Sequence, residues 1–457
     1  MRLRRTLGVV GLLAALVFAS GAAADQLTLD IPAARELARS AALSGRPDIA
    51  KAVALGLLQR DPNDSEALLA LASAELQLAQ PKAARKAAVL AFRTAPQTGQ
   101  RYVAARLAAQ AAFNQKRLTL AQYWLRRASQ TAPDPAQFQD TVTSFRQVQA
   151  QNPWRNSASL SFSPTSNVNN GSTSESDRLY INGIPSIFIL SRDARALSGY
   201  QFGLDLGTSY RISATPRSLT EIGVRLVANE VILSDAAKQQ APGARASDYA
   251  YRAAELSLTH RFALRRGKMP VSLVLVAGRN WYGGDGLTSY GRLQSSILTP
   301  LPEGFGALRW QFLAERQWAF GDSSNKTDIL SLQAQYDWQL RRGDRLGFRL
   351  GTQKTNAASD GADNHGVTAE VTYALAKPLG PVQVTLGLLA RSQNYPLYFG
   401  IGRLDRQLEL SIGMVFPKAQ IWGFAPKLEL TASKTRSNFS RFESSDVGLQ
   451  FGMASVF

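Results

Sequence analysis

The sequence predicts a chain in two parts, α-helical repeats followed by an all-β, 14-stranded antiparallel transmembrane β-barrel. Three observations predict this fold. Small and apolar residues recur with helical spacing up to about residue 151. From residue 152 onward, apolar and polar residues alternate one by one, in recurring stretches of about ten residues. No apolar run after the first 24 residues approaches the roughly 18 residues of a membrane-spanning helix, so any membrane insertion must use strands.

Residues 1–24 have the order of a signal peptide: three arginines, the apolar run Leu7–Ala19, and then Ala22–Ala24 before Asp25. The apolar run is too short to be a membrane-spanning helix. We therefore expect cleavage after Ala24 and export of the rest. The chain contains no cysteine, which excludes disulfides, thiolate-ligated metal sites and a lipid anchor on the mature amino terminus.

Residues 25–151 are predicted to form a helical domain of the tetratricopeptide type. Pro62 and Pro96 lie 34 residues apart, which is the tetratricopeptide period, and Pro96 and Pro133 delimit a similar unit. Residues 30–60 supply a preceding helix pair. The alanines between Pro81 and Pro96 recur where paired helices approach closely. Such solenoids present a concave surface to peptides or proteins, and we favour protein binding over the alternative of a structural spacer.

Residues 152–457 are predicted to form the barrel, and residues 200–211 show the pattern best. There Tyr200, Phe202 and Leu204 alternate with Gln201, Gly203 and Asp205, so one face is apolar and aromatic and the other polar. Recurrence of this pattern indicates an outer-membrane barrel with an even number of strands. The fourteen candidates are 157–164, 199–212, 218–231, 248–262, 270–282, 286–299, 305–320, 326–340, 345–355, 365–376, 381–392, 404–416, 426–435 and 445–457.

The links between these strands are predicted to alternate between short and long. Links 214–217, 341–344 and 377–380 would be periplasmic turns, and 165–198, 233–247, 356–364 and 393–403 would be extracellular loops. The alternative is a soluble β-sandwich after the helices. It is disfavoured because it would have to expose the aromatic face or bury the charged one.

The strand alternation assigns a set of charged residues to the barrel lumen. The acidic ones are opposed by arginines, which predicts a polar, cross-paired interior. The acidic candidates are Glu255, Glu315, Asp337, Glu370, Glu409 and Glu429, and the arginines are Arg225, Arg309, Arg349 and Arg391.

Nothing in the sequence argues for catalysis, a metal or a cofactor. Barrel lipases use a histidine with a serine two residues further along the strand, but Phe262 follows His260 and Val367 follows His365 at that spacing. Two isolated histidines without cysteine do not predict a metal site. The net charge of +18 is spread, with basic clusters at predicted turns. Outer-membrane lipid headgroups or an acidic partner fit this charge on an exported chain, and nucleic acid does not.

The segment Phe162–Gly171 follows the first candidate strand. It reads either as an Asn/Gly-rich loop, since these residues tolerate positive φ, or as a family motif. The chain resembles the surface lipoprotein assembly modulator (Slam) family, also called surface lipoprotein assembly modifier. The resemblance rests on Asn152-Pro153-Trp154, on strand 158–164, and on Asn167, Asn169, Asn170 and Gly171. Ser455 departs from the usual aromatic end, although Phe451, Met453 and Phe457 fit a barrel-assembly signal.

The resemblance implies a translocator in the cell outer membrane, with the helical domain in the periplasm. That domain would capture a cargo lipoprotein or a small secreted binding protein, which the barrel would help to the surface. Separately from the resemblance, the terminal Phe457 is the sort of end that the barrel-assembly machinery recognises, so we expect that machinery as an assembly partner. The first rival is an exopolysaccharide export porin with a tetratricopeptide scaffold, whose lumen would need aromatic and acidic sugar-facing residues. The second rival is a passive porin with a helical anchor.

Overall fold

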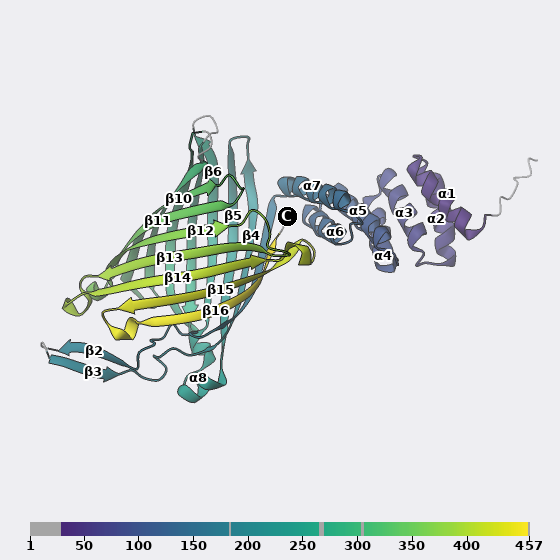
Figure 1. Ribbon diagram of the computed structural model, residues 1–457. Coiled ribbons are helices and arrows are strands. Elements are labelled where there is room, and N and C mark those ends of the chain that lie inside the picture. The colour runs from purple at the N-terminus through teal and green to yellow at the C-terminus, as the bar shows by residue number, and fades with distance from the viewer. Residues whose placement is uncertain (1–28, 182–183, 265–268, 303–305, 456–457) are drawn as a thin grey trace, which may run out of the picture. The chain divides into compact units, whose positions relative to one another are not determined.

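The computed structural model describes residues 29–181, 184–264, 269–302 and 306–455 (Figure 1). The predicted signal peptide, residues 1–24, and the terminal Phe457 lie outside these ranges. Helices precede the barrel strands along the chain. They are α1 (Ile31–Leu43), α2 (Pro47–Arg60), α3 (Ser65–Gln77), α4 (Pro81–Thr94), α5 (Thr98–Asn114), α6 (Leu118–Gln130) and α7 (Pro135–Gln151).

Helix starts follow ordinary capping chemistry. Asp64 caps α3 by accepting hydrogen bonds from the backbone N–H groups of Glu66 and Ala67, each 3.1 Å long. This cap explains why α3 begins at Ser65. Asp134 caps α7 in the same way, with Pro135 at the first helical position.

Alanine makes the close helix packing possible. Ala38, Ala54, Ala72, Ala88 and Ala104 are fully buried, and they have no long side chain to hold neighbouring helices apart. The predicted repeat-like helical arrangement is confirmed. By compactness the chain divides between Ala95 and Pro96, so α1–α4 belong to one unit and α5–α7 to the same unit as the barrel. In the described residues, no helix is both long and apolar enough to cross a membrane.

The carboxyl-terminal part is the predicted closed antiparallel barrel of fourteen strands. Every predicted strand is present, with ends shifted by a few residues. The strands are β1 (Trp154–Thr165), β4 (Gly199–Ala214), β5 (Ser218–Leu233), β6 (Tyr251–Leu264), β7 (Met269–Tyr282), β8 (Asp285–Pro300), β9 (Ala307–Ala319), β10 (Asp322–Gln339), β11 (Arg345–Asn356), β12 (Asn364–Ala374), β13 (Gln383–Tyr395), β14 (Arg403–Val415), β15 (Phe424–Ser437) and β16 (Ser444–Ser455).

The barrel has two distinct rims. Strand β1 begins with Trp154 at one rim, which we call the helix-side rim. This rim also carries the short turns 215–217 and 340–344. The opposite loop rim carries the segments 166–198, 234–250, 357–363, 396–402 and 438–443. The expected strict alternation of short and long links is wrong at two places on the loop rim. Strands β7–β8 and β9–β10 are joined by tight turns, because Gly283, Gly284 and Gly321 adopt positive φ and let the hairpins close.

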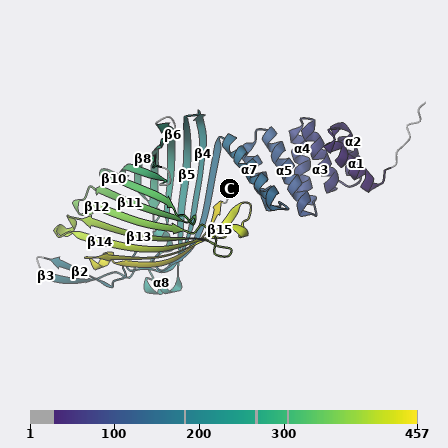
Figure 2. The same ribbon diagram turned by 45° about the horizontal axis from the view of Figure 1, so that its top comes forward.

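The 166–198 segment is not the plain loop that was predicted. It contains a second small sheet, a hairpin of β2 (Ser176–Ile181) and β3 (Ile184–Ile189). The 234–250 segment contains the short helix α8 (Asp235–Gln240), which packs into a small apolar core with Val168, Leu197 and Val231. Figure 2 shows the hairpin and α8 at the same end of the barrel. The loop rim is therefore structured around β1, β4 and β5.

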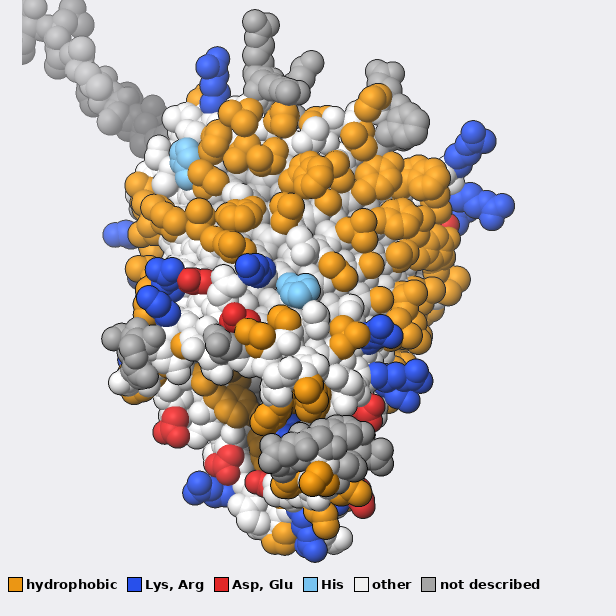
Figure 3. All heavy atoms as spheres, turned by 90° about the vertical axis from the view of Figure 1, so that its left-hand side faces the viewer, with side chains coloured by type: hydrophobic (Ala, Val, Ile, Leu, Met, Phe, Trp, Pro, Cys, Tyr) orange, Lys and Arg blue, Asp and Glu red, His pale blue; other side chains and the backbone are white. Residues whose placement is uncertain are grey.

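The outside of the barrel is apolar and bounded by aromatic residues, and Figure 3 shows hydrophobic side chains over much of the surface in that view. On β4, Tyr200 near the loop rim and Tyr210 near the helix-side rim both face outward and are exposed. Ten residues of strand, tilted by about 40°, span about 26 Å along the barrel axis. This height matches the apolar band of a transmembrane barrel.

The depth of a residue in the membrane, and whether it faces lipid or the lumen, together predict how much an introduced charge lowers the free energy of unfolding. Replacing the outward Leu332 by arginine should lower the free energy of unfolding by about 2–4 kcal/mol, because the guanidinium would lie in lipid. The neighbouring Gln333 points to the opposite face, and Gln333→Arg should cost under about 1 kcal/mol. Urea unfolding in lipid vesicles measures both. Equal costs for the two variants would contradict the assignment of faces.

Candidate functional site

The lumen is lined by the strand positions that alternate with the exposed apolar ones. Outward Leu204, Leu256 and Leu293 are 37–59% exposed, whereas the alternate positions Glu315 and Tyr290 are 8% and 5% exposed. A closed barrel shields one face of every strand from the surroundings. The buried charged and polar face is therefore the lumen.

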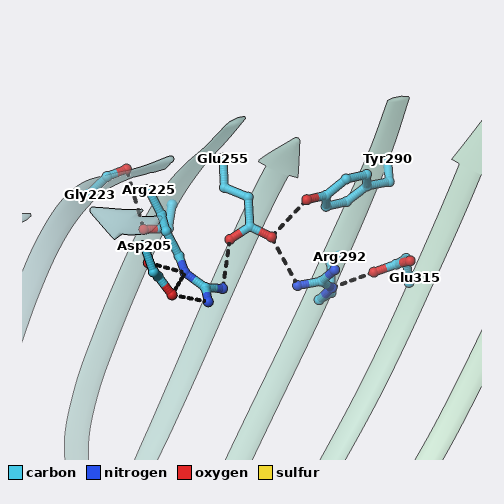
Figure 4. A network of polar contacts seen from close by, with 8 residues as sticks. Asp205, Gly223, Arg225, Glu255, Tyr290, Arg292 and Glu315 are labelled. Atoms are coloured by element: carbon cyan, nitrogen blue, oxygen red, sulfur yellow. Dashed lines mark hydrogen bonds and ion pairs between the residues drawn. The ribbon is translucent and has the colours of Figure 1, made fainter. Parts of the chain in front are cut away.

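A row of alternating charges crosses the lumen wall on β4, β5 and β6 (Figure 4). Arg225 on β5 forms an ion pair with Asp205 on β4, with Nη2 and Oδ2 separated by 2.6 Å. Its other terminal nitrogen lies 3.5 Å from Oε2 of Glu255 on β6. The register places these residues at one level of the barrel, since Arg225 pairs with Gly207 on one side and with Glu255 on the other.

The same row continues over β8 and β9. Tyr290 donates a 2.7 Å hydrogen bond to Oε1 of Glu255, and Nη1 of Arg292 lies 3.3 Å from that oxygen. Arg292 also forms an ion pair with Glu315. Tyr290 on β8 can reach β6 across β7 because its register partner is Gly278. A Cβ atom at Gly278 would lie only 2.4 Å from the Tyr290 ring.

This row, Asp205–Arg225–Glu255–Arg292–Glu315, presents paired charges to the lumen. The row holds three carboxylates and two guanidinium groups, and each carboxylate contacts a guanidinium, so the side chains are held in place. Beside it, neutral polar side chains line a lumen recess of about 290 Å³. They include Ser272, Gln294, Ser296, Gln311, Ser331 and Gln333. Such a wall offers hydrogen bonds to a passing polar chain without binding one charge tightly.

The predicted lumen residues are brought together only in part. Arg349 on β11 and Glu370 on β12 are register partners and form an ion pair, and Glu315 pairs with Arg292. Asp337 accepts hydrogen bonds from the Gln335 amide at 3.1 and 3.2 Å. Glu409 forms no ion pair within 4.0 Å among the described residues.

Sequence reasoning missed Arg292 and Tyr290 as lumen residues and did not place Asp205 with Arg225. The alternation of apolar and polar residues assigns Asp205 to the polar face of its strand. The partners depend on strand register, which sequence alone does not give. Tyr290 lies two strands from Glu255 and reaches it through the space left by Gly278 on the strand between them.

A second charged cluster lies nearer the helix-side rim. Glu221 on β5 is buried and lies between two arginines, with Arg261 Nη1 at 2.9 Å and Arg155 Nε at 3.4 Å. A neighbouring recess of about 520 Å³ is lined by Arg217, Arg261 and Arg309 among others. The helix-side mouth of the lumen is therefore basic.

The candidate family motif is a hydrogen-bonded loop. Asn167 accepts from the Gly171 N–H at 2.8 Å and donates to the Gly171 carbonyl at 2.9 Å. Asn169 donates to the carbonyls of Asp193 and Arg195 and accepts from the Leu197 N–H, so it ties both ends of the 166–198 segment together. Asn170 has φ of +50°. Gly171 leaves no room for a Cβ, which would lie 2.5 Å from the Arg195 backbone.

An apolar groove lies on the helices that precede the barrel. It has a volume of about 510 Å³ and is formed mainly by α5 and α7. Val103 is 44% exposed at its wall, with Leu107, Phe113 and Val148 along it. Arg106 on α5 spans to α7 through an ion pair with Asp140 at 2.9 Å and a hydrogen bond to Ser144 at 3.1 Å. The groove thus combines an apolar floor with polar groups at its edge.

The structure places the remaining candidate residues as follows. Phe451 and Met453 lie on the outward face of β16, exposed toward lipid. His260 contacts Thr220, and His365 contacts Asn394. In the described residues, no three His, Asp or Glu side chains are grouped as a metal would require.

Comparisons with known proteins show likenesses of fold. No family model matches the chain, and no curated protein matches it. Among solved structures, the first TPR domain of human RPAP3 is 19% identical, covering 26% of this chain and 91% of that one, with a TM-score of 0.23. A bacterial polysaccharide outer membrane secretin is 9% identical, covering 66% and 98%, with a TM-score of 0.35.

The outer membrane channel DcaP of Acinetobacter baumannii is also similar, at 11% identity. The match covers 65% of this chain and 96% of that one, with a TM-score of 0.37. Likenesses at these scores assign no function to this chain. Its function must be argued from its own groove, lumen and rims.

The charge row should contribute measurably to stability. Glu255→Ala would leave Arg225 and Arg292 without a shared partner, and we expect the free energy of unfolding to fall by about 3 kcal/mol. Glu409→Ala removes a lumen carboxylate that has no ion pair in the described residues, and should cost under about 1 kcal/mol. Urea unfolding in vesicles compares the two. A smaller loss for Glu255→Ala than for Glu409→Ala would contradict the network.

Proposed function

We propose that this chain is an outer-membrane translocator that carries a polypeptide from the periplasm to the cell surface. The cargo would be a surface lipoprotein or a small secreted binding protein, captured first by the helical domain. The observation that carries the proposal is the groove on α5 and α7, which is continuous in the chain with a transmembrane barrel. A binding surface for peptide thus precedes a pore directly.

The rims support an orientation with the helices in the periplasm. Single-chain outer-membrane barrels have short periplasmic turns and longer extracellular loops. Here the helix-side rim carries three-residue and five-residue turns at 215–217 and 340–344, and the opposite rim carries segments as long as 166–198. The predicted signal peptide fits export to the same compartment.

The lumen also supports passage of a polypeptide. The charges of the row around Glu255 are paired with one another, so a passing chain would meet there few unpaired charges and many neutral hydrogen-bonding groups. An unpaired row of one sign would hold an oppositely charged segment and slow its release. The basic helix-side mouth would favour entry of acidic segments.

The groove chemistry favours a polypeptide over a polysaccharide. Val103, Leu107, Phe113 and Val148 offer apolar surface for aliphatic side chains. Most exposed aromatic side chains of the barrel, such as Trp310 and Trp338, face outward, so they cannot stack on sugars inside the lumen. The outward end of β16, with Phe451 and Met453, would serve recognition by the barrel-assembly machinery.

The test uses cells with and without this gene and an epitope-tagged small exported protein encoded next to it. Protease shaving and antibody labelling of intact cells measure how much of the tagged protein is exposed. We expect exposure only when the gene is present. Equal exposure in both strains would overturn the proposal that this protein exports its neighbour's product, and would favour polysaccharide export or a passive pore.

A single substitution should separate capture from passage. Val103→Asp places a charge on the exposed wall of the groove without opening a core cavity, and we expect surface exposure of the tagged protein to fall about tenfold, which corresponds to ~1.4 kcal/mol of binding. Leu55→Asp changes a similarly exposed apolar residue on α2, outside the groove, and should leave exposure unchanged. Equal losses in both variants would contradict a role for the groove.

A further inference from the structure

One seam of the barrel is paired over only part of its length. Strand β1 pairs with β4 without a break from Trp154 to Thr165. With β16, its other neighbour, the register contains only Ser161↔Gly452, Phe162↔Phe451 and Thr165↔Gly448. The same register would place Ala158, Ser159 and Leu160 opposite Ser455, Ala454 and Met453, but these described residues are not paired. We call residues 158–160 the free edge.

Exposure along β1 agrees with the register. All residues from 154 to 160, the free edge included, are exposed, whereas residues 161–165 are half-buried or buried. Most other strands of the barrel alternate between exposed and less exposed positions. Leu160 is 66% exposed, against 37% for its register partner Leu204 on β4. The free edge therefore has a neighbour on one side only.

The free edge lies at a depth where backbone groups need partners. It follows Trp154, which packs against Tyr210 at the rim, and reaches Leu160 in the apolar belt. Lipid tails cannot bond backbone N–H and C=O groups, so each group left unpaired there costs several kcal/mol. Either β16 must pair along the whole edge, or another extended chain must do so.

Helix α6 holds the strands on one side of this seam. Arg126 donates hydrogen bonds to the carbonyls of Trp422 and Gly423, at 3.1 and 3.3 Å, in the turn between β14 and β15. It also donates to Ser455 Oγ on β16 at 3.3 Å, and its guanidinium lies 4.3 Å from the centre of the Phe424 ring. Burial lowers the pKa of Arg126, as expected for a guanidinium withdrawn from water.

Further contacts from α6 reach the same turn. Gln130 Oε1 accepts the Trp422 N–H at 2.9 Å, and the Arg127 guanidinium lies 5.1 Å from the centre of the Trp422 ring. Arg126, Arg127 and Gln130 thus contact the turn between β14 and β15, and Arg126 also contacts the end of β16.

Helix α7 is anchored on the other side of the seam. Arg211 on β4 donates to the last carbonyls of the helix, Ala150 and Gln151, at 2.9 and 2.8 Å. Its backbone N–H donates to the Pro153 carbonyl at 2.8 Å. Helices α6 and α7, which we call the strap, are thus fixed to β4 on one side of the β1–β16 seam and to β15 and β16 on the other.

We propose that the free edge of β1 is a docking site for an extended strand of the polypeptide that this protein exports, and that the strap keeps it unoccupied by β16. This inference rests on the proposed function. The edge would bind main chain by strand addition. The side chains of Ala158 and Ser159 are small, so they would admit many sequences. The cargo would bind first in the groove on α5 and α7 and then at this seam.

The resting seam can be tested by disulfide formation, because the native chain has no cysteine. Continuing the register by one residue would place Leu160 opposite Met453. In native membranes, oxidation of the pair Leu160→Cys and Met453→Cys should proceed at least about tenfold more slowly than oxidation of the control pair Leu160→Cys and Leu204→Cys, which joins paired neighbours. Equal rates would overturn the proposal, because β16 would then fill the edge itself.

The strap is tested by releasing one side of it. In the Leu160→Cys/Met453→Cys background, Arg126→Ala should raise the disulfide yield severalfold, since the end of β16 becomes able to pair with β1. Arg146→Ala, which replaces an exposed arginine on α7, should leave the yield unchanged. An unchanged disulfide yield with Arg126→Ala would mean that the strap does not keep the edge open.

Docking is tested with the same tagged exported protein. A short bismaleimide bridge between the two thiols of the Leu160→Cys/Met453→Cys variant should abolish surface exposure of the tagged protein, whereas the disulfide in the control pair should not. If the bridged protein exports as well as the native one, the free edge is not used, although the proposed function stands. If the native protein exposes no tagged protein, the proposed function fails, and the resting oxidation rates still report on the seam.

Discussion

Pairing of backbone groups within lipid is the constraint on which the rest of the structure depends. A barrel meets it only when its first and last strands close on each other. Here β1 pairs with β4 along its whole length and with β16 at residues 161, 162 and 165, near the loop rim. The described residues 158–160 and 453–455, which are not paired, lie on the side of these pairs where the helices enter. The contacts of α6 and α7 with the barrel therefore bear directly on how β1 and β16 pair.

The lumen solves a related problem by pairing its charges. Arg225 and Arg292 share Glu255, and each has a further carboxylate, so the interior is polar without a strong net charge. Such a wall stays hydrated and does not trap a passing segment. At the loop rim, the side-chain amides of Asn167 and Asn169 donate hydrogen bonds to backbone carbonyls and so structure the segment after β1.

Much of the fold could be predicted from the sequence, because period-two alternation and alanine spacing follow directly from strand and helix geometry. All fourteen barrel strands were predicted. The β2–β3 hairpin was not, since its apolar run lies within a segment that reads as a loop. The site was less predictable. Arg349 and Glu370 could be assigned to the lumen by alternation, but the link from Tyr290 to Glu255 requires strand register and the space at Gly278.

The central claim is that material moves from the helix side of the barrel to the loop side, with the helices in the periplasm. Single cysteines at the exposed residues Arg217, in a helix-side turn, and Ser359, on the loop rim, test this directly in the otherwise cysteine-free chain. Intact cells are treated with a membrane-impermeant maleimide. The account predicts labelling at position 359 in intact cells, and labelling at position 217 only after the outer membrane is permeabilised. Labelling at 217 but not at 359 in intact cells would contradict it.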